Sequence, residues 1–170
     1  VAAAGFSLMF GGTVGVLLVA FLIGVINMAI QPLFSHMAMG SLFANFTGGW
    51  VLPKEQRRQG VILYLHGGGY TCGDLSYAKG FASILASRCG VRVLCVAYRL
   101  APENKFPAAL DDVIEAYKYL LSKGYTGEKI TLCGESAGGG LCYALCQKLQ
   151  QLELPLPGSI IAISPWVDLT

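Results

Sequence analysis

Charged side chains are absent from the first 53 residues of the chain, and this absence divides the sequence into two parts. All 12 basic and all 10 acidic residues lie in the second part, which begins at Lys54. The charge density of that part approaches that of an ordinary soluble domain. We therefore expect an uncharged apolar segment over residues 1–53, followed by a globular domain over residues 54–170.

The composition excludes two broad classes of protein. Hydrophobic residues make up 54% of the chain and charged residues 13%, whereas a disordered chain combines low hydrophobicity with high charge. The formal net charge is only +2, and a nucleic-acid-binding protein would show a clear cationic excess. The chain is therefore expected to fold and to bind no nucleic acid.

The uncharged segment contains a candidate membrane-spanning helix over residues 8–26, in which Thr13 is the one polar side chain. A helix of this length spans about 28 Å, close to the roughly 30 Å hydrocarbon core of a bilayer. A secretory signal peptide fits less well because no cationic region precedes the apolar run. A buried helix and a fused segment are further alternatives. The sequence thus predicts an apolar helical N-terminal segment and a membrane-associated protein.

The location of the domain is a separate expectation. The basic residues that follow the apolar segment, Lys54, Arg57 and Arg58, would favour a cytoplasmic location for the domain. A soluble cytoplasmic protein is the alternative.

The six cysteines are predicted to be reduced and structural. No two of them form a C-x-x-C pair, and five lie within or beside apolar runs, where a free cysteine behaves as a small hydrophobic residue. Cys142 and Cys146 share one face of a predicted helix, but without a nearby histidine they make a poor zinc site. We expect a reducing compartment and no bound metal.

Beyond residue 54, short apolar runs alternate with segments of helical periodicity. Runs rich in Val, Ile and Leu that end at glycine predict buried strands, and apolar residues at helical spacing predict amphipathic helices. Strands are expected over residues 61–66, 91–96, 129–133 and 159–164. Helices are expected over residues 76–87, 107–122 and 136–149. This order predicts an α/β fold with a mostly parallel sheet and helices on both of its faces.

The clearest chemical motif is Gly134-Glu135-Ser136-Ala137-Gly138, which lies between a predicted strand and a predicted helix. A tight strand-to-helix turn forces strained dihedral angles on the serine and needs small neighbours on both sides. The turn also raises the hydroxyl above the sheet, where the first N–H groups of the helix favour developing negative charge. The motif predicts that Ser136 is a nucleophile. A glycine-rich helix start without chemistry is the alternative.

A second motif, His66-Gly67-Gly68-Gly69, directly follows a predicted strand. Consecutive glycines let the backbone approach a ligand closely and turn its N–H groups into a pocket. A phosphate-binding loop is disfavoured because the P-loop lysine pattern is missing and no G-x-G-x-x-G opens a helix here. Together the two motifs offer a nucleophile on one loop and oxyanion donors on the other.

With these motifs the sequence resembles the hormone-sensitive-lipase-like esterases of the α/β-hydrolase fold. The matching pieces follow in the family's order: HGGG (66–69), YRLAPE (98–103), FPAAL-DD (106–112), GESAGG (134–139) and SPW-D (164–168). The resemblance implies an esterase that acts on small acyl esters or lipids, with no metal and no organic cofactor.

The resemblance also implies a role for each motif. Ser136 would be the catalytic nucleophile. His66 would shape the glycine loop rather than act as the general base, because it is fixed to a different loop from the serine. The oxyanion hole would lie at four residues, chiefly at the N–H groups of the last three: Gly67, Gly68, Gly69 and Ala137.

Several features depart from the family pattern. The family's triad acid and histidine come from later loops, beyond Thr170, so the resemblance covers a truncated domain. His36 lies beside the uncharged segment and is interpreted as a surface or interfacial residue. Two further strands and cap helices are usual at the N-terminus, and only residues 49–52 resemble the end of such a strand. The acidic residues near the motifs match scaffold positions and are not assigned to the triad: Asp111, Asp112, Glu135 and Asp168.

These departures lead to expectations about activity. We expect the 170 residues alone to be nearly inactive and, with an apolar sheet edge exposed, to aggregate. The full-length protein is expected to be an esterase. A catalytically inactive small-molecule-binding module on the same fold is the main alternative. A membrane-anchored lipid esterase is another, and it depends on the helix over residues 8–26.

Overall fold

The computed structural model describes residues 38–43 and 46–168, with side chains from residue 46 onward. These residues belong to one compact unit of the chain, residues 37–170. The predicted apolar helix over residues 8–26, and the membrane anchoring that depends on it, lie outside the described residues. Within the described part, no helix is long and apolar enough to cross a membrane.

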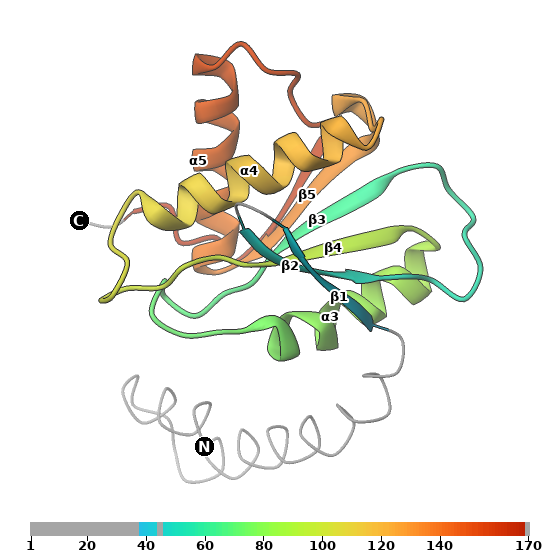
Figure 1. Ribbon diagram of the computed structural model, residues 1–170, viewed down its shortest axis with the longest axis horizontal. Helices are drawn as coiled ribbons and strands as arrows, with labels where there is room; N and C mark the ends of the chain where they lie inside the picture. Colours follow the sequence, from blue (N-terminus) through green and yellow to red (C-terminus); the bar gives the residue numbers. More distant parts are fainter. Residues whose placement is uncertain (1–37, 44–45, 169–170) are drawn as a thin grey trace, which may run out of the picture. The chain divides into compact units, whose positions relative to one another are not determined.

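A six-stranded sheet forms the centre of the described unit, in the order β1-β2-β4-β3-β5-β6 (Figure 1). Its strands are β1 (Ala38–Phe43), β2 (Phe46–Val51), β3 (Val61–Leu65), β4 (Arg92–Ala97), β5 (Ile130–Glu135) and β6 (Ser159–Ile163). β3 runs parallel to both β4 and β5, and β6 runs parallel to β5. β2 is antiparallel to both β1 and β4. The prediction of a mostly parallel sheet is confirmed.

Helices cover both faces of the sheet, as predicted. The helices are α3 (Leu75–Cys89), α4 (Ala108–Ser122) and α5 (Ala137–Gln151), with a short 3-10 turn, η1 (Gly127–Lys129), before β5. α3 lies on one face, and α4 and α5 lie on the other (Figure 1). Alternation along β3 explains this division, because successive side chains of a strand point to opposite faces. Val61, Leu63 and Leu65 pack toward α4 and α5, whereas Ile62 and Tyr64 pack toward α3.

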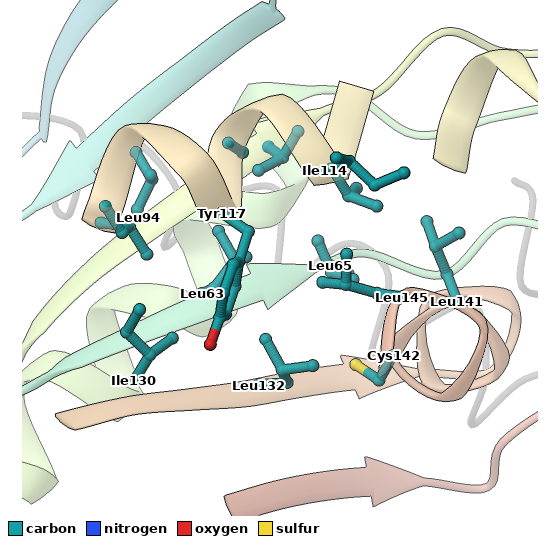
Figure 2. Close-up of a cluster of buried hydrophobic side chains, with 14 of the residues drawn as sticks. Leu63, Leu65, Leu94, Ile114, Tyr117, Ile130, Leu132, Leu141, Cys142 and Leu145 are labelled. Carbon is teal, nitrogen blue, oxygen red and sulfur yellow. The ribbon is translucent and has the colours of Figure 1, made fainter. Parts of the chain in front are cut away.

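The larger of the two hydrophobic clusters fixes α4 and α5 to the sheet. Figure 2 shows side chains of β3, β4 and β5 meeting those of the two helices. Tyr117 of α4 is fully buried among them, and its hydroxyl donates to the carbonyl oxygen of Pro155 at 2.8 Å. Each large buried side chain contributes about 1.5–3 kcal/mol. This cluster therefore holds in place the ends of β3 and β5, which carry the two sequence motifs.

The ends of α3 show why this segment forms a helix. The carboxylate of Asp74 accepts the N–H of Tyr77 at 2.8 Å and caps the first turn. At the other end Gly90 adopts a left-handed conformation, with φ 65°, and donates its N–H to Ala86. Gly90 therefore ends the helix. The cap at Asp74 marks the start of this helix, a few residues after the glycine loop.

The sheet extends further toward the N-terminus than the sequence indicates. β1 and β2 come from the uncharged segment, where only residues 49–52 resemble the end of a strand. β2 contains Gly48 and Gly49, and glycine has a low strand propensity. Gly48 suits its place because a Cβ there would stand 3.1 Å from the carbonyl oxygen of Cys95 in β4. Pairing with β4, rather than local sequence, therefore accounts for this strand.

An ion pair between the exposed side chain of Arg99 and the buried carboxylate of Asp112 holds the segment between β4 and α4. Asp112 is only 3% exposed, and its carboxylate accepts the backbone N–H of Arg99 at 2.8 Å. The guanidinium of Arg99 lies 2.8 Å from the same carboxylate. These contacts fit a scaffold role for Asp112.

β6 forms the edge of the sheet opposite β1. Ile161 and Ile163 on this strand are 47% and 40% exposed. Aggregation through this apolar edge stays a prediction.

Candidate active site

Ser136 occupies the sharp turn between β5 and α5. Its backbone has φ 50° and ψ −119°, a region that side-chain-bearing residues rarely adopt and that stores strain. The N–H of Ser136 donates to Ile163 at 2.9 Å, and its carbonyl oxygen accepts the N–H of Trp166 at 2.9 Å and of Gly140 at 3.1 Å. The serine is exposed. The turn is therefore fixed by its surroundings while the residue itself remains accessible.

Close contacts with backbone atoms require glycine at three positions around the serine. A Cβ on Gly134 would overlap the carbonyl oxygen of Gly138, and a Cβ on Gly138 would overlap the carbonyl oxygens of Leu65 and His66. A Cβ on Gly140 would overlap the carbonyl oxygen of Trp166. Backbone atoms at such distances cannot yield without moving a whole element, so only glycine fits at these positions.

The glycine loop follows β3 and turns sharply. Gly68 and Gly69 have φ values of 121° and 61°. The carbonyl oxygen of Gly68 accepts the N–H groups of Thr71 and Cys72, both at 3.1 Å. A Cβ on Gly68 would overlap the carbonyl oxygen of Cys72. The loop therefore closes on itself in a conformation that needs glycine.

The structure brings the two sequence motifs together. A Cβ added to Gly67 would stand 3.3 Å from the Cβ of Ser136 and 3.2 Å from the carbonyl oxygen of Glu135. The parallel arrangement of β3 and β5 explains this, because the carboxyl ends of adjacent parallel strands lie at the same edge of the sheet. The predicted nucleophile and the predicted glycine loop thus share one site.

The N–H groups of the glycine loop differ in their partners. The N–H of Gly67 is directed at the carboxylate of Glu135, at 3.4 Å. Across the described residues, no hydrogen bond engages the N–H of Gly68, Gly69 or Ala137. Three backbone donors therefore remain open beside the serine.

His66 lies beneath the glycine loop and is fully buried. Its Nδ1 stands 2.7 Å from the carbonyl oxygen of Gly67, which can only accept, so Nδ1 carries the proton. The ring stacks on Tyr98 with a centroid distance of 4.3 Å, and Tyr98 donates its hydroxyl to the carbonyl oxygen of His66 at 2.6 Å. A Cβ on Gly73 would overlap the imidazole. This position suits a residue that shapes the loop. His36, the other histidine, lies outside the described residues.

The protonation of His66 follows from its burial, which lowers the pKa of this histidine below its usual value. We expect the folded protein to lose stability as the pH falls below about 6.5. The unfolded histidine takes up a proton near its ordinary pKa, whereas the buried ring resists protonation, so acid favours the unfolded chain. One such site changes stability by at most about 1.4 kcal/mol for each pH unit.

Thermal unfolding between about pH 7.5 and 5 tests this expectation around the ordinary histidine pKa. The full-length protein is compared with His66→Asn and with His36→Asn as the matched control. The acid-induced loss should shrink in His66→Asn and persist in His36→Asn. An NMR titration of the His66 ring in the unmodified protein gives a second readout, and titration at or above the ordinary pKa would contradict the argument.

An open groove of about 570 Å³ runs beside the serine turn. Aromatic and apolar side chains dominate its lining, among them Tyr70, Tyr143 and Trp166. The hydroxyl of Tyr70 donates to the carbonyl oxygen of Ala137 at 3.0 Å, which links the glycine loop to the first residue of α5. The rings of Tyr70 and Trp166 lie 6.4 Å apart. The groove offers an apolar surface close to the turn that carries Ser136.

The sequence analysis matched Glu135 only to a scaffold position. It gave no role to four further residues near this site: Tyr70, Tyr77, Tyr143 and Trp166. Tyr70 directly follows the three glycines, and Trp166 belongs to the SPW-D piece, so proximity to a motif was an available signal for both. Tyr77 lies on a predicted helix with nothing local to distinguish it.

Comparison with known proteins agrees with this arrangement. Residues 62–170 match the protein family described as alpha/beta hydrolase fold. The chain belongs to the α/β-hydrolase family. Within it, the chain groups with the hormone-sensitive-lipase-like esterases, which confirms the resemblance found in its motifs.

Two curated relatives and one solved structure show how this α/β-hydrolase compares with others. It is 42% identical over 123 residues to an acetyl-hydrolase of Streptomyces hygroscopicus, a match that covers 72% of this chain and 41% of the relative. It is 42% identical over 120 residues to Esterase LipU of Mycobacterium tuberculosis, covering 70% of this chain and 39% of the relative. The crystal structure of an esterase from the bacterial hormone-sensitive lipase family superposes with a TM-score of 0.75 at 35% identity. That match covers 84% of this chain and 50% of the esterase. The chain therefore spans half or less of the length of these proteins.

Proposed function

We propose that the full-length protein is a carboxylic ester hydrolase in which Ser136 is the nucleophile. The observation that carries the proposal is the close approach of Gly67 to Ser136, which sets backbone donors beside an exposed, strained serine. The relatives named acetyl-hydrolase and esterase support an ester as the bond that is cleaved. They do not favour the non-catalytic binding module, which becomes an outcome of the test below.

The proposed oxyanion hole consists of the N–H groups of Gly68, Gly69 and Ala137. When the serine oxygen attacks a carbonyl carbon, the carbonyl oxygen becomes negatively charged and needs such donors. One donor of this kind is worth about 3–4 kcal/mol of transition-state stabilisation. Gly67 contributes differently, because its N–H is directed at Glu135 and its missing side chain permits the close approach. His66 supports the loop from beneath.

The reaction then follows from these positions. The Ser136 oxygen forms a bond to the ester carbonyl carbon and loses its proton to a base, and the alcohol leaves as it regains a proton. Water then attacks the acyl-enzyme and releases the acid. The base is not His66, which is buried and tied to Gly67. We propose that the base and its acidic partner lie in loops beyond residue 170, and the resemblance to the hormone-sensitive-lipase-like esterases supports this.

The groove suggests the class of substrate. Its aromatic lining at Tyr70, Tyr143 and Trp166 suits the apolar acyl or alcohol part of a small ester, since burial of apolar surface supplies binding energy without directional bonds. A lipid with a longer chain is the second possibility, and acyl-chain preference separates the two.

Hydrolysis of p-nitrophenyl esters of increasing acyl length by the full-length protein tests the proposal. We expect release of p-nitrophenol with a preference for short chains, and a serine-reactive phosphonate should label the peptide that contains Ser136. A folded full-length protein that binds the ester but releases no alcohol would overturn the proposal and favour a binding module. Labelling of a different residue would overturn the assignment of Ser136.

A further inference from the structure

We propose that Glu135 is a positioning residue whose carboxylate holds the glycine loop against the serine turn, so that the N–H groups of Gly68 and Gly69 face the reacting carbonyl. This inference rests on the proposed function, because it requires those N–H groups to be oxyanion donors. It extends that function by giving a task to the last residue of β5, which directly precedes the proposed nucleophile.

Donors from three parts of the fold converge on one oxygen of this carboxylate. Oε1 of Glu135 accepts the hydroxyl of Tyr77 at 2.7 Å and the hydroxyl of Tyr64 at 3.0 Å. The same oxygen lies 3.4 Å from the backbone nitrogen of Gly67. Tyr77 belongs to α3, Tyr64 to β3, and Gly67 to the glycine loop. We call these four residues the Glu135 tether.

The tether acts on the backbone that carries the donors. Glu135 is covalently joined to Ser136, and both its carboxylate and its carbonyl oxygen lie against Gly67. The N–H of Gly67 is thereby turned toward the carboxylate. In the described structure, the next two N–H groups of the loop, those of Gly68 and Gly69, form no hydrogen bond and remain available. The first glycine thus anchors the loop, and the other two present donors.

The negative charge of Glu135 limits how this residue can assist the reaction. No ion pair in the described part of the chain includes this carboxylate, so its charge is met by hydrogen bonds. Burial, together with the neighbouring carboxylate, raises the pKa of both Tyr64 and Tyr77 above the usual tyrosine value, which keeps both hydroxyls protonated as donors. A negative charge near a developing oxyanion opposes the reaction by Coulomb repulsion. Any benefit from Glu135 must therefore come through placement of the loop.

Charge repulsion and loop placement by Glu135 change kcat in opposite directions, so the direction of the change in a variant distinguishes them. Glu135→Gln in the full-length protein removes the repulsion but weakens the tether, because a neutral oxygen accepts hydrogen bonds less strongly. We expect kcat for p-nitrophenyl acetate to fall about 10- to 100-fold with KM nearly unchanged, since a small displacement of catalytic groups costs up to about 10²-fold. Tyr77→Phe removes one donor and leaves a half-exposed ring, and a smaller fall in kcat is expected. Glu128 is an exposed glutamate on η1. Glu128→Gln is therefore the matched control and should retain the kcat of the unmodified protein.

Hydrogen–deuterium exchange of residues 67–73 provides a readout independent of turnover. Faster exchange in Glu135→Gln than in Glu128→Gln, together with the fall in kcat, supports the tether. An unchanged or raised kcat in Glu135→Gln overturns it, and if this variant does not fold, an unchanged kcat in Tyr77→Phe does the same. If the unmodified protein hydrolyses no ester, the proposed function fails by itself. Hydrogen–deuterium exchange then tests the tether by itself. An unchanged exchange rate of residues 67–73 in both Glu135→Gln and Tyr77→Phe overturns the tether as well.

Discussion

Replacing Ser136 with alanine in the full-length protein should lower kcat for ester hydrolysis on the order of 10⁶-fold. Loss of the nucleophile in a serine hydrolase removes the covalent route, and the remaining groups accelerate the reaction only by about 10³- to 10⁴-fold over water. The apolar groove and the proposed oxyanion donors are untouched, so we expect ester binding to persist. Steady-state kinetics with a p-nitrophenyl ester measures the loss.

A matched control separates this effect from general damage. Ser87→Ala changes an exposed serine in α3, far along the chain from either motif, and should leave both kcat and the melting temperature near those of the unmodified protein. Ser136→Ala should also keep its melting temperature, because alanine and serine tolerate the same turn about equally. Turnover by Ser136→Ala near the unmodified rate would show that another group is the nucleophile.

The second large effect concerns the packing of the serine turn. Gly138→Ala should destabilise the protein by about 3 kcal/mol and reduce kcat by at least about 10²-fold. The new methyl group would overlap the carbonyl oxygens of Leu65 and His66. Relief requires α5 to move away from the end of β3, which displaces Ser136 from the glycine loop. Denaturant unfolding and ester kinetics on the same preparation measure both effects.

Gly80→Ala is the natural comparison for this variant. Gly80 lies within α3, and a Cβ there would meet nothing within 4 Å. Because alanine is favoured over glycine in a helix interior, this variant should gain about 0.5–1 kcal/mol. Equal stability changes in Gly138→Ala and Gly80→Ala would refute the contact argument.

Much of this architecture was predictable from the sequence because the signals are local. Apolar runs bounded by glycine placed β3, β4, β5 and β6, and helical periodicity placed α3, α4 and α5. The family's order of motifs indicated that the serine turn and the glycine loop belong together. The apolar runs, the helical periodicity and each motif depend on residues that are close together in the sequence, so each can be recognised without the folded structure.

What the sequence did not reveal depends on distant contacts. β2 contains paired glycines and becomes a strand through its pairing with β4. Glu135 meets Tyr64 and Tyr77 across separations of 71 and 58 residues, and neither tyrosine stands in a recognisable motif. The N–H of Gly67 is directed at the Glu135 carboxylate, whereas those of Gly68 and Gly69 form no hydrogen bond within the described residues. This difference likewise depends on a carboxylate that only the folded sheet brings close.

The positive φ of Ser136 has a consequence for how such a protein changes over time. Glycine would occupy this backbone conformation without the strain that a side chain incurs. Under the proposed function, a hydroxyl at this position serves the reaction at a cost in stability, and selection for ester hydrolysis would retain it. The same proposal implies that a related protein without selection for esterase activity could carry glycine at this position and keep the rest of the fold.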